Sequence, residues 1–162
     1  MTSADILQKM IDYSQGNLHD IAHLLKVYAY ARTIGEAEHL DAKVQKTVET
    51  AAIIHDIACP LCRQKYGNTN GHYQEIESEP LVREFLADCE LPQDIVERVV
   101  YLVSHHHSPH LIDGIDFQVL IEADYLVNAD ESSYPTQSIC TARDTIFKTQ
   151  TGTALLKSIY RV

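Results

Sequence analysis

Apolar side chains recur every three or four residues along most of this chain, which is the spacing of an α-helix with one buried face. The first such segment ends at a turn that contains Gly16, and the second begins near Asn17, whose side chain can cap a helix. The first three helices are therefore predicted over residues 4–13, 17–36 and 41–55.

The same spacing returns in the second half of the chain. Leu81, Phe85 and Leu86 mark a fourth helix, and Pro92 opens a fifth that runs through Val103. No strand-like alternation and no repeat is present, so we expect an all-α, single-domain bundle of about six to eight helices. The remaining predictions are helices over residues 117–124 and 136–147 and at the C-terminus, loops over residues 58–72 and 108–115, and one domain over residues 1–162.

The composition fits this expectation. The chain has 162 residues, of which 45% are hydrophobic and 22% are charged, as is typical of one soluble globular domain. No 18-residue apolar run is present, and the N-terminus lacks the pattern of a secretory signal, so we expect a cytoplasmic protein without a membrane span. Its four cysteines are then expected to be reduced thiols rather than disulfides.

The formal net charge of −10 limits the expected partners. Duplex nucleic acid and anionic membranes are disfavoured, because both are bound through clustered Lys and Arg side chains. A phosphorylated small molecule remains compatible, since divalent metal ions and a few local cations can invert the field inside a pocket. Whether the chain is a monomer or a homodimer stays open.

Titratable side chains interrupt the apolar helix faces at several places. The run AAIIHDIACPLC over residues 51–62 contains His55 and Asp56, and Asp124 lies on the apolar face of the sixth helix. Burial of such groups is costly unless a counter-charge, a hydrogen-bond network or a metal ion compensates it. Asp56 is also unfavourable beside a helix C-terminus unless a cation is near. Taken alone, His23 is compatible with an ordinary hydrogen-bonded histidine, and Asp124 with a buried salt bridge.

Together, His23, His55, Asp56 and Asp124 supply two imidazoles and two carboxylates. This mixed nitrogen and oxygen set suits octahedral divalent ions such as manganese, iron, cobalt, nickel or magnesium. Zinc is a further candidate, although it would favour fewer carboxylates. We therefore expect one or two divalent metal ions as cofactor.

These residues resemble the HD superfamily of metal-dependent phosphohydrolases, whose pattern is an early histidine, a His-Asp doublet and a late aspartate on an all-helical scaffold. The resemblance covers residues 17–131 and implies an HD-type helical bundle with a C-terminal helical extension over residues 132–162. Many relatives have glycine where this chain has Ala58, so the backbone turn there can differ. The matching segments are HLLKVYAYA (23–31), AAIIHDI (51–57) and EADYLVNADE (122–131).

Some two-metal members of the superfamily add a histidine after the doublet and a histidine pair before the late aspartate. His72 and the triplet His105, His106 and His107 occupy those places, and the resemblance implies a second metal or phosphate site built from some of them. Within the triplet, His106 and His107 are preferred over His105. Where such relatives can have an acidic ligand four residues before the first histidine, this chain has His19, which argues against a fully formed second site.

The resemblance implies hydrolysis of a phosphomonoester, a nucleotide or a related phosphorylated small molecule. His55 and Asp56 would carry the reaction, with Asp56 as a metal ligand that also orients the attacking water. Lys26, Lys65 and Arg98 are candidates to neutralise the phosphate oxygens that are not transferred.

Two other functions are compatible with the sequence. An HD protein can be a non-catalytic, metal-stabilised module that senses nucleotides or binds partners. Alternatively, Cys59 and Cys62 have the spacing of a redox pair or of half a zinc site. The β-α-β context of a redox motif and a second pair of cysteines are both missing, which disfavours this reading.

Overall fold

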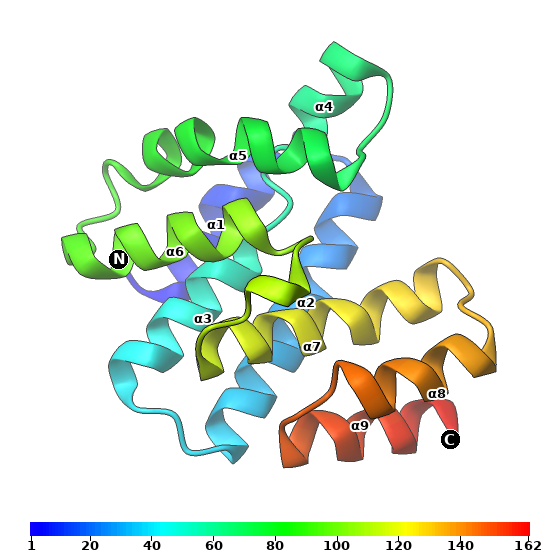
Figure 1. Cartoon of the computed structure of the whole chain (residues 1–162). Helices are drawn as coiled ribbons and strands as arrows, with labels where there is room; N and C mark the ends of the chain where they lie inside the picture. Colours follow the sequence, from blue (N-terminus) through cyan, green and yellow to red (C-terminus); the bar gives the residue numbers. More distant parts are fainter.

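The computed structural model describes residues 1–162, which form helices connected by short turns (Figure 1). The all-α class predicted from the sequence is confirmed. The α-helices are α1 (Ser3–Tyr13), α2 (Leu18–Ala37), α3 (Ala42–Ile54), α4 (Cys59–Tyr66), α5 (Gly71–Leu86), α6 (Gln93–His105), α7 (Ile115–Glu131), α8 (Thr136–Thr145) and α9 (Gln150–Tyr160), with one 3-10 turn, η1 (Pro109–Leu111).

Helices α2, α3 and α7 pack against one another at the centre of the molecule. Helices α1 and α6 cover α3, α5 lies on α6, and the pair α8–α9 attaches through α9 to α7 and α2 (Figure 1). Fully buried side chains such as Val27, Ile53 and Leu120 fill the centre, and each contributes about 1.5–3 kcal/mol to folding. None of the helices combines the length and the apolar character needed to cross a membrane.

Side-chain caps fix where the two central N-terminal helices begin. Asn17 accepts a hydrogen bond from the backbone N–H of Asp20, as predicted for the start of α2. Asp41 caps α3 by accepting from the N–H groups of Lys43 and Val44. Helix α3 ends at Ile54, so His55 and Asp56 follow directly after its buried C-terminal end.

The segment 58–72 differs from the predicted loop, because it contains the short helix α4 and the start of α5. Pro60 lies in the first turn of α4, where a helix does not need its N–H. Gly67 ends α4 in the left-handed region at φ +73°. Ala58 has φ −80° and ψ −13°, a right-handed conformation that needs no glycine. The second predicted loop, 108–115, contains the single turn η1.

A buried carboxylate attaches the C-terminal helices to the centre of the molecule. Glu122 on α7 is fully buried and accepts hydrogen bonds from the backbone N–H groups of Lys148 (2.6 Å) and Thr149 (2.9 Å) and from the Gln118 side-chain amide (2.7 Å). The Thr149 hydroxyl donates to the same carboxylate and accepts from the N–H of Gly152, which caps α9. The turn before α9 therefore depends on Glu122.

We expect Glu122→Gln to lower the free energy of unfolding by about 2–4 kcal/mol, because an amide cannot accept from all the donors that face the carboxylate. Denaturant unfolding followed by circular dichroism measures this loss. The matched control is Glu79→Gln, at an exposed residue whose only partner is Arg83 one helical turn away, and it should change little. Equal effects of the two substitutions would contradict the attachment role of Glu122.

Candidate metal centre

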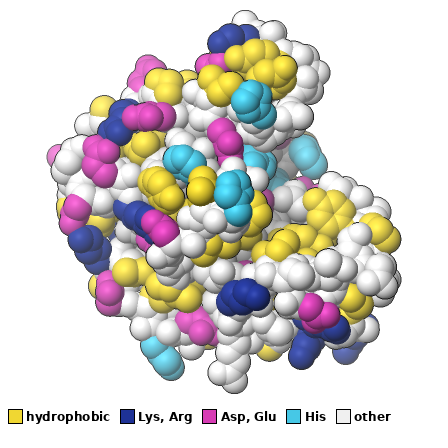
Figure 2. All heavy atoms as spheres, viewed as in Figure 1, with side chains coloured by type: hydrophobic (Ala, Val, Ile, Leu, Met, Phe, Trp, Pro, Cys, Tyr) yellow, Lys and Arg dark blue, Asp and Glu magenta, His cyan; other side chains and the backbone are white.

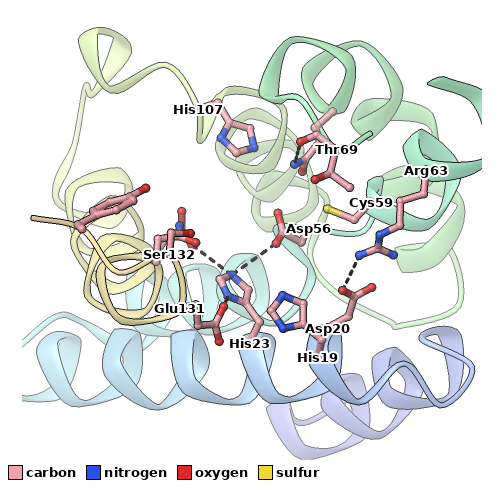
Figure 3. A pocket seen from close by; sticks show the side chains of 14 residues that line it. His19, Asp20, His23, Asp56, Cys59, Arg63, Thr69, His107, Glu131 and Ser132 are labelled. Carbon is pink, nitrogen blue, oxygen red and sulfur yellow. Dashed lines mark hydrogen bonds and ion pairs between the residues drawn. The ribbon is translucent and has the colours of Figure 1, made fainter. Parts of the chain in front are cut away.

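The four predicted ligands converge at one point between α2, α3 and α7. The Nε2 atoms of His23 and His55 lie 3.0 Å apart. Asp124 Oδ1 lies 3.3 Å from His23 Nε2 and 3.5 Å from His55 Nε2, and Asp56 Oδ2 lies 3.4 Å and 3.6 Å from the same two atoms. Figure 3 shows His23 on α2 pointing toward Asp56 across the floor of a cavity. Two imidazole nitrogens and two carboxylate oxygens thus face a common centre.

The outer nitrogens of the buried imidazoles are held by hydrogen bonds. His55 Nδ1 lies 2.8 Å from the carbonyl oxygen of Ala52, and His106 Nδ1 lies 2.8 Å from that of Val103. A carbonyl can only accept, so Nδ1 carries the proton in each ring. The Nε2 atoms of His55 and His106 therefore face the cluster, where they can bind an ion, and this is the usual arrangement of histidine ligands.

Glu131 orients the third imidazole. His23 Nδ1 lies 2.8 Å from Glu131 Oε2, and the other carboxylate oxygen accepts from Lys26 Nζ at 3.1 Å. The sequence interpretation missed Glu131, although it stands seven residues after Asp124 and so lies two turns along the same face of α7. Lys26 is the partner of this glutamate and does not line the cavity.

Two buried atoms in the cluster, His106 Nε2 and Asp124 Oδ1, form no hydrogen bond of regular geometry, and their polar neighbours at 3.3–3.5 Å are other candidate ligand atoms. Such atoms are rare in folded proteins, and each costs about 1–3 kcal/mol if nothing compensates it. A divalent cation is a partner that an imidazole lone pair and a carboxylate oxygen can share. The donor set therefore fits a metal ion.

The charges in the cluster favour a cation as well. Burial raises the pKa of Asp56 and of Asp124, but the neighbouring imidazoles outweigh it and hold both pKa values well below the usual range of an aspartic acid. Burial lowers the pKa of His23, yet Asp124, Asp56 and Glu131 together raise that pKa to about 9. The aspartates therefore stabilise positive charge at this centre, which an imidazolium or a bound cation can supply.

A second set of ligand atoms adjoins the first. Asp56, His106 and His107 each offer an atom within reach of a common ion, so Asp56 belongs to both sets. Two other predicted residues lie outside these sets. His105 is bonded through Nδ1 to the carbonyl of Tyr101, and His72 is exposed in the first turn of α5.

Gly71 opens α5 directly against the ring of His107. A Cβ atom added at this glycine would lie 2.7 Å from the Cγ of His107, well inside van der Waals contact. The glycine therefore lets α5 approach the second set of ligands, and this close approach rather than a left-handed turn explains the residue.

A cavity of about 400 Å³ opens above the ligands, with His19 and Asp20 on its α2 side (Figure 3). The lining residues are His19, Asp20, His23, Asp56, Cys59, Arg63, Thr69, Gln74, His107, Asp124, Asn128, Glu131, Ser132 and Tyr134. Among them, Arg63 on α4 is the only Lys or Arg, and its guanidinium lies 2.5 Å from Asp20 Oδ1. The cavity is thus strongly polar and has one permanent cation.

The cations expected to contact phosphate lie elsewhere. Lys65 pairs with Glu77, and Arg98 forms hydrogen bonds with the carboxylates of Asp113 and Asp116. Neither lines the cavity, whereas Arg63, which the sequence interpretation missed, does. Arg63 lines the cavity because it stands one helical turn after Cys59, on the face of α4 that meets the cavity.

The cysteines of the doublet segment are both free thiols. Cys59 lines the cavity, and burial together with the nearby Asp56 raises its pKa far above the ordinary value of a thiol. Cys62 is fully buried on the next turn of α4. A protonated thiol is a poor nucleophile, so Cys59 is a wall of the cavity rather than a reactive group.

Residues 19–141 match the HD domain family, and the chain belongs to that family. Among solved structures, the chain is similar to the crystal structure of a predicted HD superfamily hydrolase from an uncultured Thermotogales bacterium. The two share 20% sequence identity with a TM-score of 0.70, over 98% of this chain and 84% of the other, which supports the HD fold. No curated protein matched the chain.

We expect His55→Ala and Asp124→Asn each to lower the bound metal at least about tenfold, because each removes a ligand of the first set. Elemental analysis of protein purified without chelators measures the metal content of each variant. His39→Ala is the matched control at an exposed histidine and should bind as much metal as the wild type. Full metal content in both ligand variants would contradict the assignment.

Proposed function

We propose that this protein hydrolyses the phosphoester bond of a phosphorylated small molecule with the help of one or two divalent metal ions. The observation that carries the proposal is the convergence of two imidazole nitrogens and two carboxylate oxygens, from His23, His55, Asp56 and Asp124, beside a polar cavity. The HD family membership and the all-helical fold support the same function.

His23, His55, Asp56 and Asp124 would hold the first ion, and Asp56 with His106 and His107 would hold a second. A divalent ion at such a site binds phosphate oxygen and makes water a better nucleophile. The mixed set suits manganese, iron, cobalt, nickel, magnesium or zinc. Within the chain, Glu131 holds His23 in the orientation that presents its Nε2 to the ion.

The residues around the ligands would position the substrate. The ionised carboxylate of Asp56 can accept a hydrogen bond from the attacking water, and the Arg63 guanidinium can donate to phosphate oxygens. The new bond joins the water oxygen to phosphorus, and the bond to the organic oxygen breaks. The water supplies the proton that the leaving alcohol needs, so the reaction consumes water alone.

The size and charge of the site favour a small substrate. A cavity of about 400 Å³ lies within the range of small-molecule sites, and a net charge of −10 disfavours binding to a duplex or an anionic membrane. The partner of this protein is therefore proposed to be a phosphorylated small molecule.

We expect Arg63→Gln to lower kcat/KM for p-nitrophenyl phosphate by about 10- to 100-fold without loss of bound metal, because it removes a charged hydrogen bond to the phosphate. Steady-state kinetics with each of the six metals, together with elemental analysis, measures both quantities. The control is Arg83→Gln, an exposed arginine of α5 outside the cavity. Equal kinetics of Arg63→Gln and wild type would contradict the role of Arg63.

Asp56→Asn should abolish turnover, because the side chain belongs to both ligand sets. If hydrolysis continued at the wild-type rate in this variant, the activity would come from another protein or another site. If the wild type bound nucleotides tightly but consumed no phosphoester with any metal, a sensing module would replace the enzyme as the best assignment.

A further inference from the structure

Tyr134 stands where the metal-site cavity continues into two further hollows. A cavity of about 280 Å³ shares His107, Asp124, Asn128 and Tyr134 with the metal-site cavity. A third cavity of about 410 Å³ follows along α8, and Tyr134 also lines this one. The three cavities therefore adjoin one another at Tyr134, and we refer to them together as the groove, which leads away from the candidate ligands.

The wall of the groove changes character along its length. Near the ligands it carries the carboxylates and imidazoles described above, whereas farther along it carries Tyr125, Tyr134, Ile121, Ile146 and Ala142. Figure 2 shows histidines at the back of a hollow between the α4–α5 side and the α7–α8 side, and hydrophobic side chains along its lower edge. Neither of the two outer cavities is lined by Lys or Arg.

The turn between α7 and α8 holds Tyr134 in place. The residue before it, Ser133, has φ +49°, in the left-handed region that non-glycine residues rarely adopt. The backbone N–H of Tyr134 donates to the carbonyl of Ala129 at 2.9 Å, and Pro135 follows directly. The backbone on both sides of the tyrosine is thus fixed, while its side chain is 37% exposed.

A second aromatic ring supports the first. The ring of Tyr125 meets that of Tyr134 edge to face, with centroids 5.5 Å apart, and packs against Phe147 on its other side at 5.7 Å. The Tyr125 hydroxyl donates to the carbonyl of Ser138. The outer groove therefore has a preformed aromatic wall, and little side-chain ordering is required when a ligand binds.

We propose that the outer groove binds the organic part of the phosphoester, and that this part carries an uncharged, flat aromatic ring that packs on Tyr134. This inference rests on the proposed hydrolase function, because the phosphate must lie at the metal centre for the organic part to reach the groove. Nucleosides and simple aryl alcohols share this chemistry.

The lining of the groove excludes other occupants. A second phosphate or another strongly anionic group would find no Lys or Arg there to compensate its charge. An alkyl chain would leave Gln137, Ser138, Thr141 and Thr145 facing an apolar ligand, whereas ring heteroatoms can form hydrogen bonds with them. A flat ring uses both the aromatic wall and the polar rim.

Two pairs of phosphomonoesters test the inference, because the members of each pair leave as alcohols of similar acidity. Adenosine 5′-phosphate is compared with ribose 5-phosphate, and benzyl phosphate with cyclohexylmethyl phosphate. The aromatic member of at least one pair should have a kcat/KM about tenfold higher, mainly through a lower KM. The two pairs distinguish a nucleoside from a simple aryl group.

Substitutions of Tyr134 then test whether this residue causes the preference for the aromatic substrate. The kcat/KM ratio of each preferred pair should fall toward one in Tyr134→Leu, which keeps an apolar side chain, and should persist in Tyr134→Phe. The control is Tyr28→Ala, a partly buried tyrosine of α2 outside the three cavities, and it should preserve the ratio. Ratios near one in both pairs of the wild type, or faster hydrolysis of the non-aromatic member of both pairs, would overturn the inference.

A binding measurement separates this inference from the proposed hydrolysis. Calorimetric titration of the wild type and Tyr134→Leu with adenosine and with benzyl alcohol needs no turnover. Binding that weakens about tenfold in Tyr134→Leu supports the groove as a ring site even where no phosphoester is consumed, which would contradict only the hydrolase. Hydrolysis of both members of each pair at equal rates, with no ring binding, would contradict only the ring site.

Discussion

Ionised carboxylates held among buried imidazoles need positive charge to compensate them, and the centre of this molecule is built around that requirement. Asp56 and Asp124 approach His23 and His55 at 3.3–3.6 Å in the interior of an α-helical bundle. Without a cation or protons between them, this arrangement would be strongly unfavourable. The three central helices each contribute to it, so the packed centre of the protein also holds the candidate ligands.

In this fold the packed centre holds the candidate ligands, and the residues around it line the groove. Helices α2, α3 and α7 hold the ligands in a close-packed centre, where small shifts are costly. The walls of the groove combine residues of these helices with others from α4, from the turn after α7 and from α8. Such an arrangement lets related chains keep one chemistry while they change the compound on which it acts.

Two of the candidate ligands could be predicted from the sequence because each violates a local rule, whereas His23 was assigned from the family resemblance. An aspartate at a helix C-terminus and another on an apolar face are costly without a partner, so Asp56 and Asp124 could be found from pattern alone. Arg63 and Glu131 violate no such rule, since charged residues at these positions are ordinary on a helix surface. Their roles depend on which helices meet, and the sequence pattern does not contain that information. Arg98 was misassigned for the same reason, because its partners Asp113 and Asp116 lie across a turn.

The helix boundaries were predictable where a cap and an apolar stripe coincide, as at Asn17. They failed at α4, where Pro60, Gly67 and several polar side chains resemble a loop although the backbone is helical. A proline in the first turn and a left-handed glycine at the end are compatible with a helix as well as with a turn. Only the packing of the segment against its neighbours decides between the two.

The candidate metal centre also restricts which residue can open the peripheral helix α5, at Gly71. Its backbone needs no left-handed conformation, unlike that of Gly67, and the ring of His107 alone leaves no room for a side chain. A residue with a side chain is therefore disfavoured at Gly71, although the first turn of a surface helix usually accepts many residue types. In the connection between α4 and α5, Gly67 is held by its left-handed backbone and Asn70 caps α5, so Asn68 and Thr69 are the positions at which substitution can change the mouth of the cavity without moving a ligand.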